Sequence, residues 1–208
     1  MALKKLSDPY TIRASASITT VGAGANPSDT VTSTIDTGLD ALRQEVLAIW
    51  AVQFGINASD DGQQMLAALQ VPIAQIIAGS IGEDSVKWGT RMGLNSEVQG
   101  LVESFDDPQV VAFDSHNCEA YLYDAGSNSP RVVLTESANQ FPETYDPNEP
   151  GVPLAYVTSS QMEFFVNAFI DGQTTSSTFG GITGSVRILA QRLKADASLY
   201  AALLSGLA

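Results

Sequence analysis

Hydrophobic and polar residues alternate along much of this chain with a period of two, which is the pattern of β-strands that bury one face. Residues 11–20, TIRASASITT, are the clearest case, because Ile12, Ala14 and Ile18 share one face and polar side chains occupy the other. Glycine and proline residues follow, and both suit turns and interrupt strand pairing. The pattern predicts a half-buried strand here and an all-β protein overall.

Other segments share this alternation or are rich in β-branched residues, which strands favour. The further predicted strands are residues 30–36, 45–56, 86–92, 110–113, 118–123, 131–134, 157–170 and 185–192. Residues 60–70 fit either a helix that begins at Asp60 or a strand, and we favour the strand. About eight to ten strands with turns about every 8–15 residues are typical of a sandwich or jelly roll rather than of βαβ units.

The strongest predicted strand is EVLAIWAVQFGI, residues 45–56. Its even-numbered positions, from Val46 to Ile56, are all apolar and are predicted to share one face. Its odd-numbered positions are apolar only in the first half, and Gln53 lies in the second half. We therefore expect a strand that is covered on both faces for half of its length. A buried helix is the alternative, which the alternation and the aromatic residues disfavour.

Two segments of different composition interrupt this pattern. Residues 140–153, QFPETYDPNEPGVP, contain four prolines and are predicted as an exposed excursion, because proline fits neither a helix interior nor a central strand. Near the end, Asp196 is suited to cap a short helix over residues 197–204, whose apolar stripe includes Leu199. We expect one jelly-roll or β-sandwich barrel domain over residues 1–208, with a short N-terminal arm.

The composition is poor in side chains that perform chemistry. The 208 residues include one histidine, one cysteine, four lysines and six arginines, so we expect neither an enzyme nor a bound cofactor. The net charge of −13 disfavours nucleic-acid binding, because affinity for phosphate backbones grows with the number of Lys and Arg contacts. No stretch approaches the roughly 18 apolar residues of a membrane span. The N-terminus lacks the apolar core of a secretory signal.

Two groups of residues are candidates for a chemical site. His116 and Cys118 lie two positions apart with Asp114 nearby, but we expect a turn over residues 114–117 beside a strand cysteine rather than a nucleophilic centre. The ligands needed for a zinc site are not supplied, so no metal site is predicted. In the proline-rich segment the acidic residues are spaced by three, a spacing that does not match a calcium loop and favours a solvated loop. These residues are Glu143, Asp146 and Glu149, and a calcium ion there is left open.

Three stretches resemble small capsid proteins of icosahedral viruses, in particular the single jelly-roll (upright β-barrel) shell proteins of prokaryotic viruses. TIDTGLD (34–40) followed by EVLAIWAV (45–52) is similar to the first barrel strands of such proteins. LAYV (154–157) with MEFFVN (162–167) is similar to a late strand pair. Residues 185–204 are similar to the closing strand and terminal helix.

The resemblance implies a structural protein that assembles with copies of itself through lateral contacts into an icosahedral virion in the host cytoplasm. It leaves open a second capsid protein or penton and an internal membrane as partners. Many related shells carry an Arg-rich arm for the genome, whereas only Lys4 and Lys5 precede Arg13 here. We expect assembly to depend more on apolar residues such as Phe165 and Phe169 than on the terminal helix.

Two other functions stay open. The first alternative is a β-sandwich binding module for a carbohydrate or protein ligand, with Tyr121, Tyr123 and Tyr145 as the candidate aromatic contacts. The second is a hydrolase on a β scaffold, whose paired carboxylates could lie far apart in the sequence.

Overall fold

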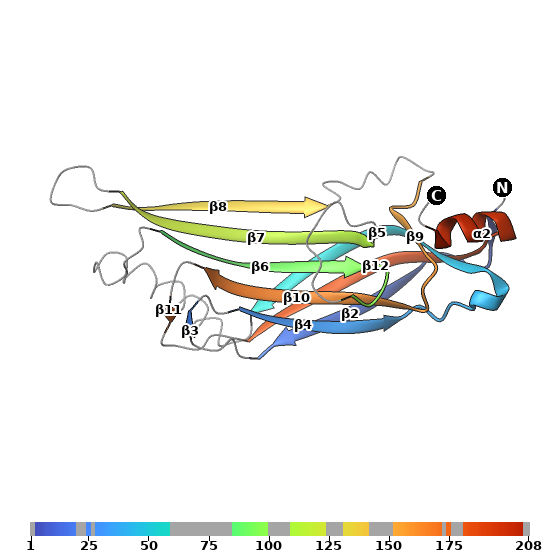
Figure 1. The fold of residues 1–208 in the computed structure, drawn as a ribbon, viewed down its shortest axis with the longest axis horizontal. Helices are drawn as coiled ribbons and strands as arrows, with labels where there is room; N and C mark the ends of the chain where they lie inside the picture. Colours follow the sequence, from blue (N-terminus) through green and yellow to red (C-terminus); the bar gives the residue numbers. More distant parts are fainter. Residues whose placement is uncertain are drawn as a thin grey trace.

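Two antiparallel β-sheets face each other along the long axis of the molecule (Figure 1). The computed structural model describes residues 3–19, 24–25, 28–58, 85–99, 109–123, 131–141, 152–171, 174–175 and 181–205. In these residues strands predominate, with one short 3₁₀ turn, η1 (Ala41–Arg43), and one α-helix, α2 (Ala197–Leu204). The predicted all-β class is confirmed.

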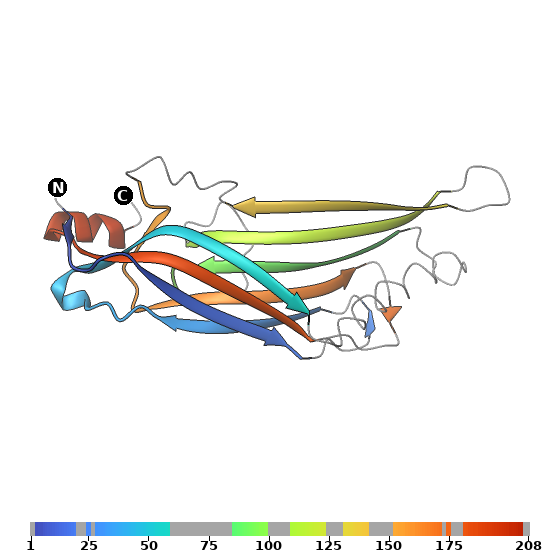
Figure 2. The ribbon, with the colours of Figure 1, turned by 180° about the vertical axis from the view of Figure 1, so that it is seen from behind.

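The first sheet, which we call the β12 sheet, has β12 (Ile182–Lys194) between β2 (Tyr10–Ile18) and β5 (Glu45–Ala58). The short strand β1 (Lys4–Lys5) also pairs with β12, and β9 (Ala155–Val157) pairs with β5. Figure 2 shows β2, β12 and β5 crossing the molecule side by side, in blue, red and cyan.

The second sheet, which we call the β10 sheet, contains five strands. Their order is β4 (Ser28–Asp36), β10 (Gln161–Asp171), β6 (Ser85–Asn95), β7 (Val110–Tyr123) and β8 (Arg131–Phe141). Two further short strands, β3 (Gly24–Ala25) and β11 (Thr174–Thr175), form a separate ribbon.

The main strands pair in a nested order. β2 pairs with β12, β4 with β10, β5 with β9, and β6 with β7. The first of these strands thus pairs with the last, and in the sequence each following pair is enclosed by the pair before it. Four nested antiparallel pairs shared between two sheets are the jelly-roll topology. The predicted jelly roll is confirmed, and β8 widens the β10 sheet beyond β7.

The core lies between the sheets and takes its side chains from alternate strand positions. In β2 this alternation is as predicted, since Ala16 and Ile18 are buried while Ser15 and Ser17 are exposed. The buried side chains of both sheets form one cluster, which includes Leu47, Ile49, Met92, Leu94, Met162, Phe164, Val166, Val186 and Ile188. Across the sandwich, the rings of Phe54 and Phe164 stack with their centroids 6.3 Å apart.

A β-bulge in β5 overturns part of the predicted face assignment. Ala190 of β12 is opposite Ile49, and Leu189 is opposite Ala51, so Trp50 is the extra residue in β5. One inserted residue reverses which side chains face inward. The core therefore receives odd-numbered residues of β5 before the bulge and even-numbered ones after it. The single apolar face predicted from Val46 to Ile56 is wrong. Double coverage of the first half is confirmed, because residues 46–49 are all buried.

Several strand boundaries also differ from the prediction. The expected turn at residues 114–117 is instead the middle of β7, which is paired on both sides, with β6 and with β8. The predicted strand 157–170 is two strands in different sheets, because β9 ends at Val157 and β10 begins at Gln161. β8 runs on to Phe141, so the first two residues of the predicted excursion at 140–153 are strand.

Some predictions fall on segments that lie outside the described residues. They are the strand or helix at 60–70, the connection at 124–130, and the proline-rich segment from 142 to 151.

The predicted C-terminal helix is confirmed as α2. The side chain of Asp196 caps it by accepting a hydrogen bond from the backbone N–H of Leu199 at 2.9 Å. None of the eight residues of α2 is buried, although Leu199, Tyr200 and Leu203 are half-buried. In the described part of the chain, no helix has the length and apolar character needed to cross a membrane.

The sheets approach closely at Gly184, near the start of β12. A β-carbon at Gly184 would collide with Val166 of the β10 sheet and would lie 3.1 Å from the sulfur of Met92. We therefore expect Gly184→Ala to lower the free energy of unfolding by about 1–3 kcal/mol, because an added methyl group overpacks the core. Urea denaturation of the two proteins measures this difference.

The matched control is Ser15→Ala, which changes an exposed position on the neighbouring strand. It should alter the free energy of unfolding by no more than about 0.5 kcal/mol. An unchanged urea midpoint for Gly184→Ala would mean that the sheets separate at this point without cost.

Candidate functional site

The only histidine of the chain lies on β7 beside an aspartate. His116 Nε2 is 3.4 Å from Asp114 Oδ1, and the two side chains are 48% and 16% exposed. Asp114 is opposite Met92 of β6, and His116 is opposite Thr90. Both of these β6 residues are buried. Cys118 lies two residues further along β7, opposite Trp88, and its side chain lies outside the described part.

The pair of Asp114 and His116 has the geometry of a partly exposed ion pair. Such pairs contribute at most about 1 kcal/mol, because water screens them. An orienting carboxylate and an imidazole are two members of a nucleophilic triad, and Cys118 is the third residue type that a triad needs. Among the described residues, no three His, Cys, Asp or Glu side chains gather in a way that could hold a metal ion.

Other candidate residues lie where the structure gives no side-chain geometry. Glu143, Asp146 and Glu149 lie outside the described residues, so a calcium ion in that segment stays an open question. Tyr121 and Tyr123 lie among the last three residues of strand β7, and their side chains are not among those described. Tyr145 also lies outside the described residues.

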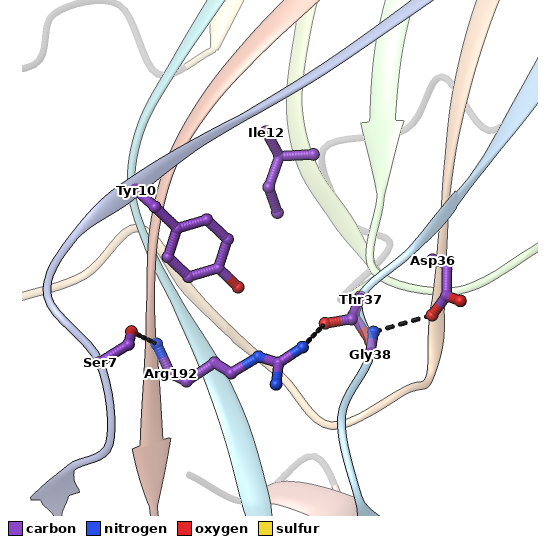
Figure 3. A pocket seen from close by; sticks show the side chains of 7 residues that line it. All are labelled: Ser7, Tyr10, Ile12, Asp36, Thr37, Gly38 and Arg192. Carbon is purple, nitrogen blue, oxygen red and sulfur yellow. Dashed lines mark hydrogen bonds between the residues drawn. The ribbon is translucent and has the colours of Figure 1, made fainter.

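The structure reveals a cavity that sequence reasoning missed, at the end of the sandwich that carries the chain termini (Figures 1 and 3). Its volume is about 520 Å³, and its lining comes from the N-terminal arm, β2, the segment after β4, and β12. The lining residues are Ser7, Tyr10, Ile12, Asp36, Thr37, Gly38 and Arg192.

Arg192 connects three segments around this cavity (Figure 3). Its Nη2 donates a hydrogen bond to the carbonyl oxygen of Thr37 at 3.0 Å. Its backbone N–H donates to the hydroxyl of Ser7 at 3.1 Å. The hydroxyl of Thr37 donates in turn to the carbonyl oxygen of Ser159, at 2.9 Å. The N-terminal arm, the β4–η1 connection and the β9–β10 connection are thus tied together at one end of the fold.

Gly38 allows the guanidinium group to lie against the backbone. Gly38 has a φ of +61°, and a β-carbon there would collide with Nη2 of Arg192. Its N–H donates to Oδ1 of Asp36 at 2.8 Å, which closes the turn after β4. Only glycine combines this left-handed backbone with so close a neighbour. The arrangement is a structural clasp that holds the guanidinium group against the turn after β4.

The pairing of Thr37 with Arg192 could not be deduced from the sequence, because 155 positions separate the two residues.

No family model matches the chain, and no curated protein shows significant similarity to its sequence.

Removing the Arg192 side chain should destabilise the fold. We expect Arg192→Ala to lower the free energy of unfolding by about 1–3 kcal/mol, because a charged hydrogen bond to a backbone carbonyl is lost. Arg192→Lys should recover only part of this loss, since an ammonium group lacks the planar fork of a guanidinium. Thermal or urea unfolding measures both effects.

The matched control for this prediction is Arg43→Ala. Arg43 forms an exposed salt bridge with Asp40 at 3.2 Å, so its removal should change the free energy of unfolding by less than about 1 kcal/mol. Equal effects of the two alanine substitutions would contradict the clasp.

Substitution of His116 or Cys118 by Ala should change stability only modestly. The ion pair of His116 with Asp114 is partly exposed, so its loss should cost no more than about 1 kcal/mol. Circular dichroism and urea unfolding measure the fold, and an esterase and glycosidase substrate panel measures turnover. A turnover present in the wild type and lost in a folded His116→Ala protein would support the hydrolase alternative.

Proposed function

We propose that this chain is the shell subunit of an icosahedral virus and assembles with copies of itself through lateral contacts. The jelly roll is one of the folds from which viral capsids are built, although lectins and cupins use it as well. The fold alone therefore does not select a function. The observation that carries the proposal is a surface at one end of the sandwich that exposes three leucines.

This surface, which we call the apolar end, contains three leucines from separate segments. Leu42 of η1 is 96% exposed, Leu204 of α2 is 61% exposed, and Leu6 next to β1 is 45% exposed. Figures 1 and 2 place η1, α2 and the N-terminal arm at the same end. A hydrogen bond from the N–H of Ala195 to the carbonyl oxygen of Gln44, at 3.1 Å, joins the start of α2 to the end of η1.

The helix α2 needs more cover than its own subunit provides. A helix of eight residues is not stable in water by itself, since isolated helices below about 12 residues are marginal. Its apolar side chains are only half-buried or exposed. Contact with a neighbouring copy would bury them, and obligate interfaces are apolar in this way. In this proposal α2 therefore packs partly on its own subunit and partly on a neighbour.

The two phenylalanines singled out in the sequence have a different role. Phe165 is only 1% exposed and its ring packs on the backbone of Gly93, so it stabilises its own subunit. Phe169 lies under the guanidinium group of Arg91, 4.3 Å from ring centroid to Cζ. Because its own chain buries Phe165, we propose that this residue supports assembly through the stability of its subunit rather than by contact with a neighbour.

The apolar end predicts a specific loss of assembly. We expect purified wild-type protein to form large particles by size-exclusion chromatography and negative-stain electron microscopy. Leu42→Asp combined with Leu204→Asp should weaken this self-association at least about tenfold, because a charge would have to be buried in an apolar contact. The substituted subunit should stay folded by circular dichroism, since neither leucine is buried in the monomer.

The control variant is Val98→Asp. Val98 is also an exposed apolar residue, 52% exposed, but it follows β6 and belongs to none of the three segments of the apolar end. Particles should persist in this variant. If the wild type stays monomeric at all concentrations, the shell proposal fails and the binding-module alternative gains weight, which binding to a glycan array would then test.

A further inference from the structure

Two arginines lie opposite each other on the outer face of the β12 sheet. Arg13 of β2 and Arg187 of β12 are register partners in adjacent strands. Both are exposed, and the residues on either side of each arginine pack in or against the core. The alternation of both strands therefore directs the two guanidinium groups to the same outer surface.

The surface beside these arginines is hollow and polar. Gln53 of β5 is the second register partner of Arg187, and the next row of the sheet consists of Ser15, Ser185 and Gly55. Because Gly55 has no side chain, a depression of about 460 Å³ opens here. We call this surface the arginine groove and define it by Arg13, Ser15, Gln53, Gly55, Ser185 and Arg187.

The described residues do not neutralise the two positive charges. Neither guanidinium group forms a salt bridge or a hydrogen bond with the residues that the structure describes. The row on the other side of the pair consists of Thr11, Leu189 and Ala51, so the register neighbours supply no carboxylate. Like charges directly opposite each other on adjacent strands repel, so the pair disfavours the isolated subunit. An anion bound between them would remove this repulsion.

Two neighbouring guanidinium groups are suited to bind an oxyanion. A guanidinium group donates two parallel hydrogen bonds to a carboxylate or a phosphate. The groove also offers the hydroxyl of Ser15 and the amide of Gln53 as further polar groups at its rim. β12 is hydrogen-bonded on both sides, to β2 and β5, so the backbone positions of the groove are fixed before any ligand binds. A fixed site loses little freedom on binding.

We propose that the arginine groove binds carboxylate side chains of a second copy of this chain. The chain has 23 acidic and 10 basic residues, so carboxylates are by far the commonest charged groups that another copy presents. A phosphate polymer is the other occupant that two guanidinium groups can bind, and the test below distinguishes it from carboxylates. This inference rests on the proposed function, since it assigns a second, electrostatic contact between shell subunits in addition to the apolar end.

The test compares self-association of three full-length proteins at low and high salt. The variants are Arg13→Gln combined with Arg187→Gln, and Lys4→Gln combined with Lys5→Gln. Both variants lose two exposed positive charges and so have the same net charge. The arginine variant should weaken self-association at least about tenfold at low salt, measured by light scattering and sedimentation. The lysine variant should change it less than about twofold, and salt should weaken the wild type but barely affect the arginine variant.

A direct binding arm separates this inference from the shell proposal. Poly-L-glutamate is titrated into each protein at a protein concentration below that of assembly, and calorimetry follows the binding of the polymer. Single-stranded DNA and inorganic phosphate are titrated in the same way at equal ionic strength. Binding of poly-L-glutamate to the wild type and the lysine variant, but not to the arginine variant, supports the groove even if no particle forms. Tighter binding of DNA or phosphate than of poly-L-glutamate would overturn the carboxylate assignment. Equal behaviour of the two variants would show that only net charge matters and would overturn the site itself.

Discussion

The pairing of β12 with both β2 and β5 is the constraint on which the rest of the structure depends. β12 is the last strand of the chain, yet it lies between two of the earliest strands. The β12 sheet can therefore form only after the whole chain has been folded back on itself. The remaining pairs, β4–β10, β5–β9 and β6–β7, follow from this closure, because each lies nested within the one before it.

The distance between the sheets follows from a few positions on β12 and β10. Gly184 lets β12 approach Val166 and Met92, and the stacked rings of Phe54 and Phe164 fill the space between β5 and β10. The bulge at Trp50 makes that stack possible, because it turns Phe54 toward the core. Small and large side chains at facing positions thus interlock the two layers.

The outer surfaces of the two sheets differ in character. The β10 sheet buries Phe165 and Glu163 on its outer side, where the carboxylate of Glu163 accepts a hydrogen bond from the N–H of Gln99 at 2.9 Å. The β12 sheet leaves a polar outer face that contains Arg13 and Arg187. A subunit with an apolar end and one open, charged face has two chemically distinct surfaces for neighbours. That combination is what the proposed shell function requires, because lateral contacts in a closed shell must differ in direction.

The sequence by itself determined the secondary structure class and much of the core. Alternation at Ile12 to Ile18 and at Met162 to Ala168 identified strands and their buried faces, and Asp196 identified the terminal helix. These features depend on residues close together in the chain, whose side chains must alternate if one face is to be buried. Only the tertiary structure showed that the inward face of β5 changes from odd-numbered to even-numbered residues at Trp50, because the pairing with β12 locates the bulge.

The same distinction applies to the sites. The sequence identified His116 and Cys118 as neighbours, but it placed His116 in a turn before a strand, because Asp114 to Asn117 have the composition of a turn. Pairing with β6 and β8 on both sides keeps that segment extended. The clasp of Arg192 on Thr37 and the pairing of Arg13 with Arg187 join residues that are 155 and 174 positions apart, since β12 returns to the strands that began the chain. Local pattern carries no information about such partners, and the closure of the jelly roll alone brings them together.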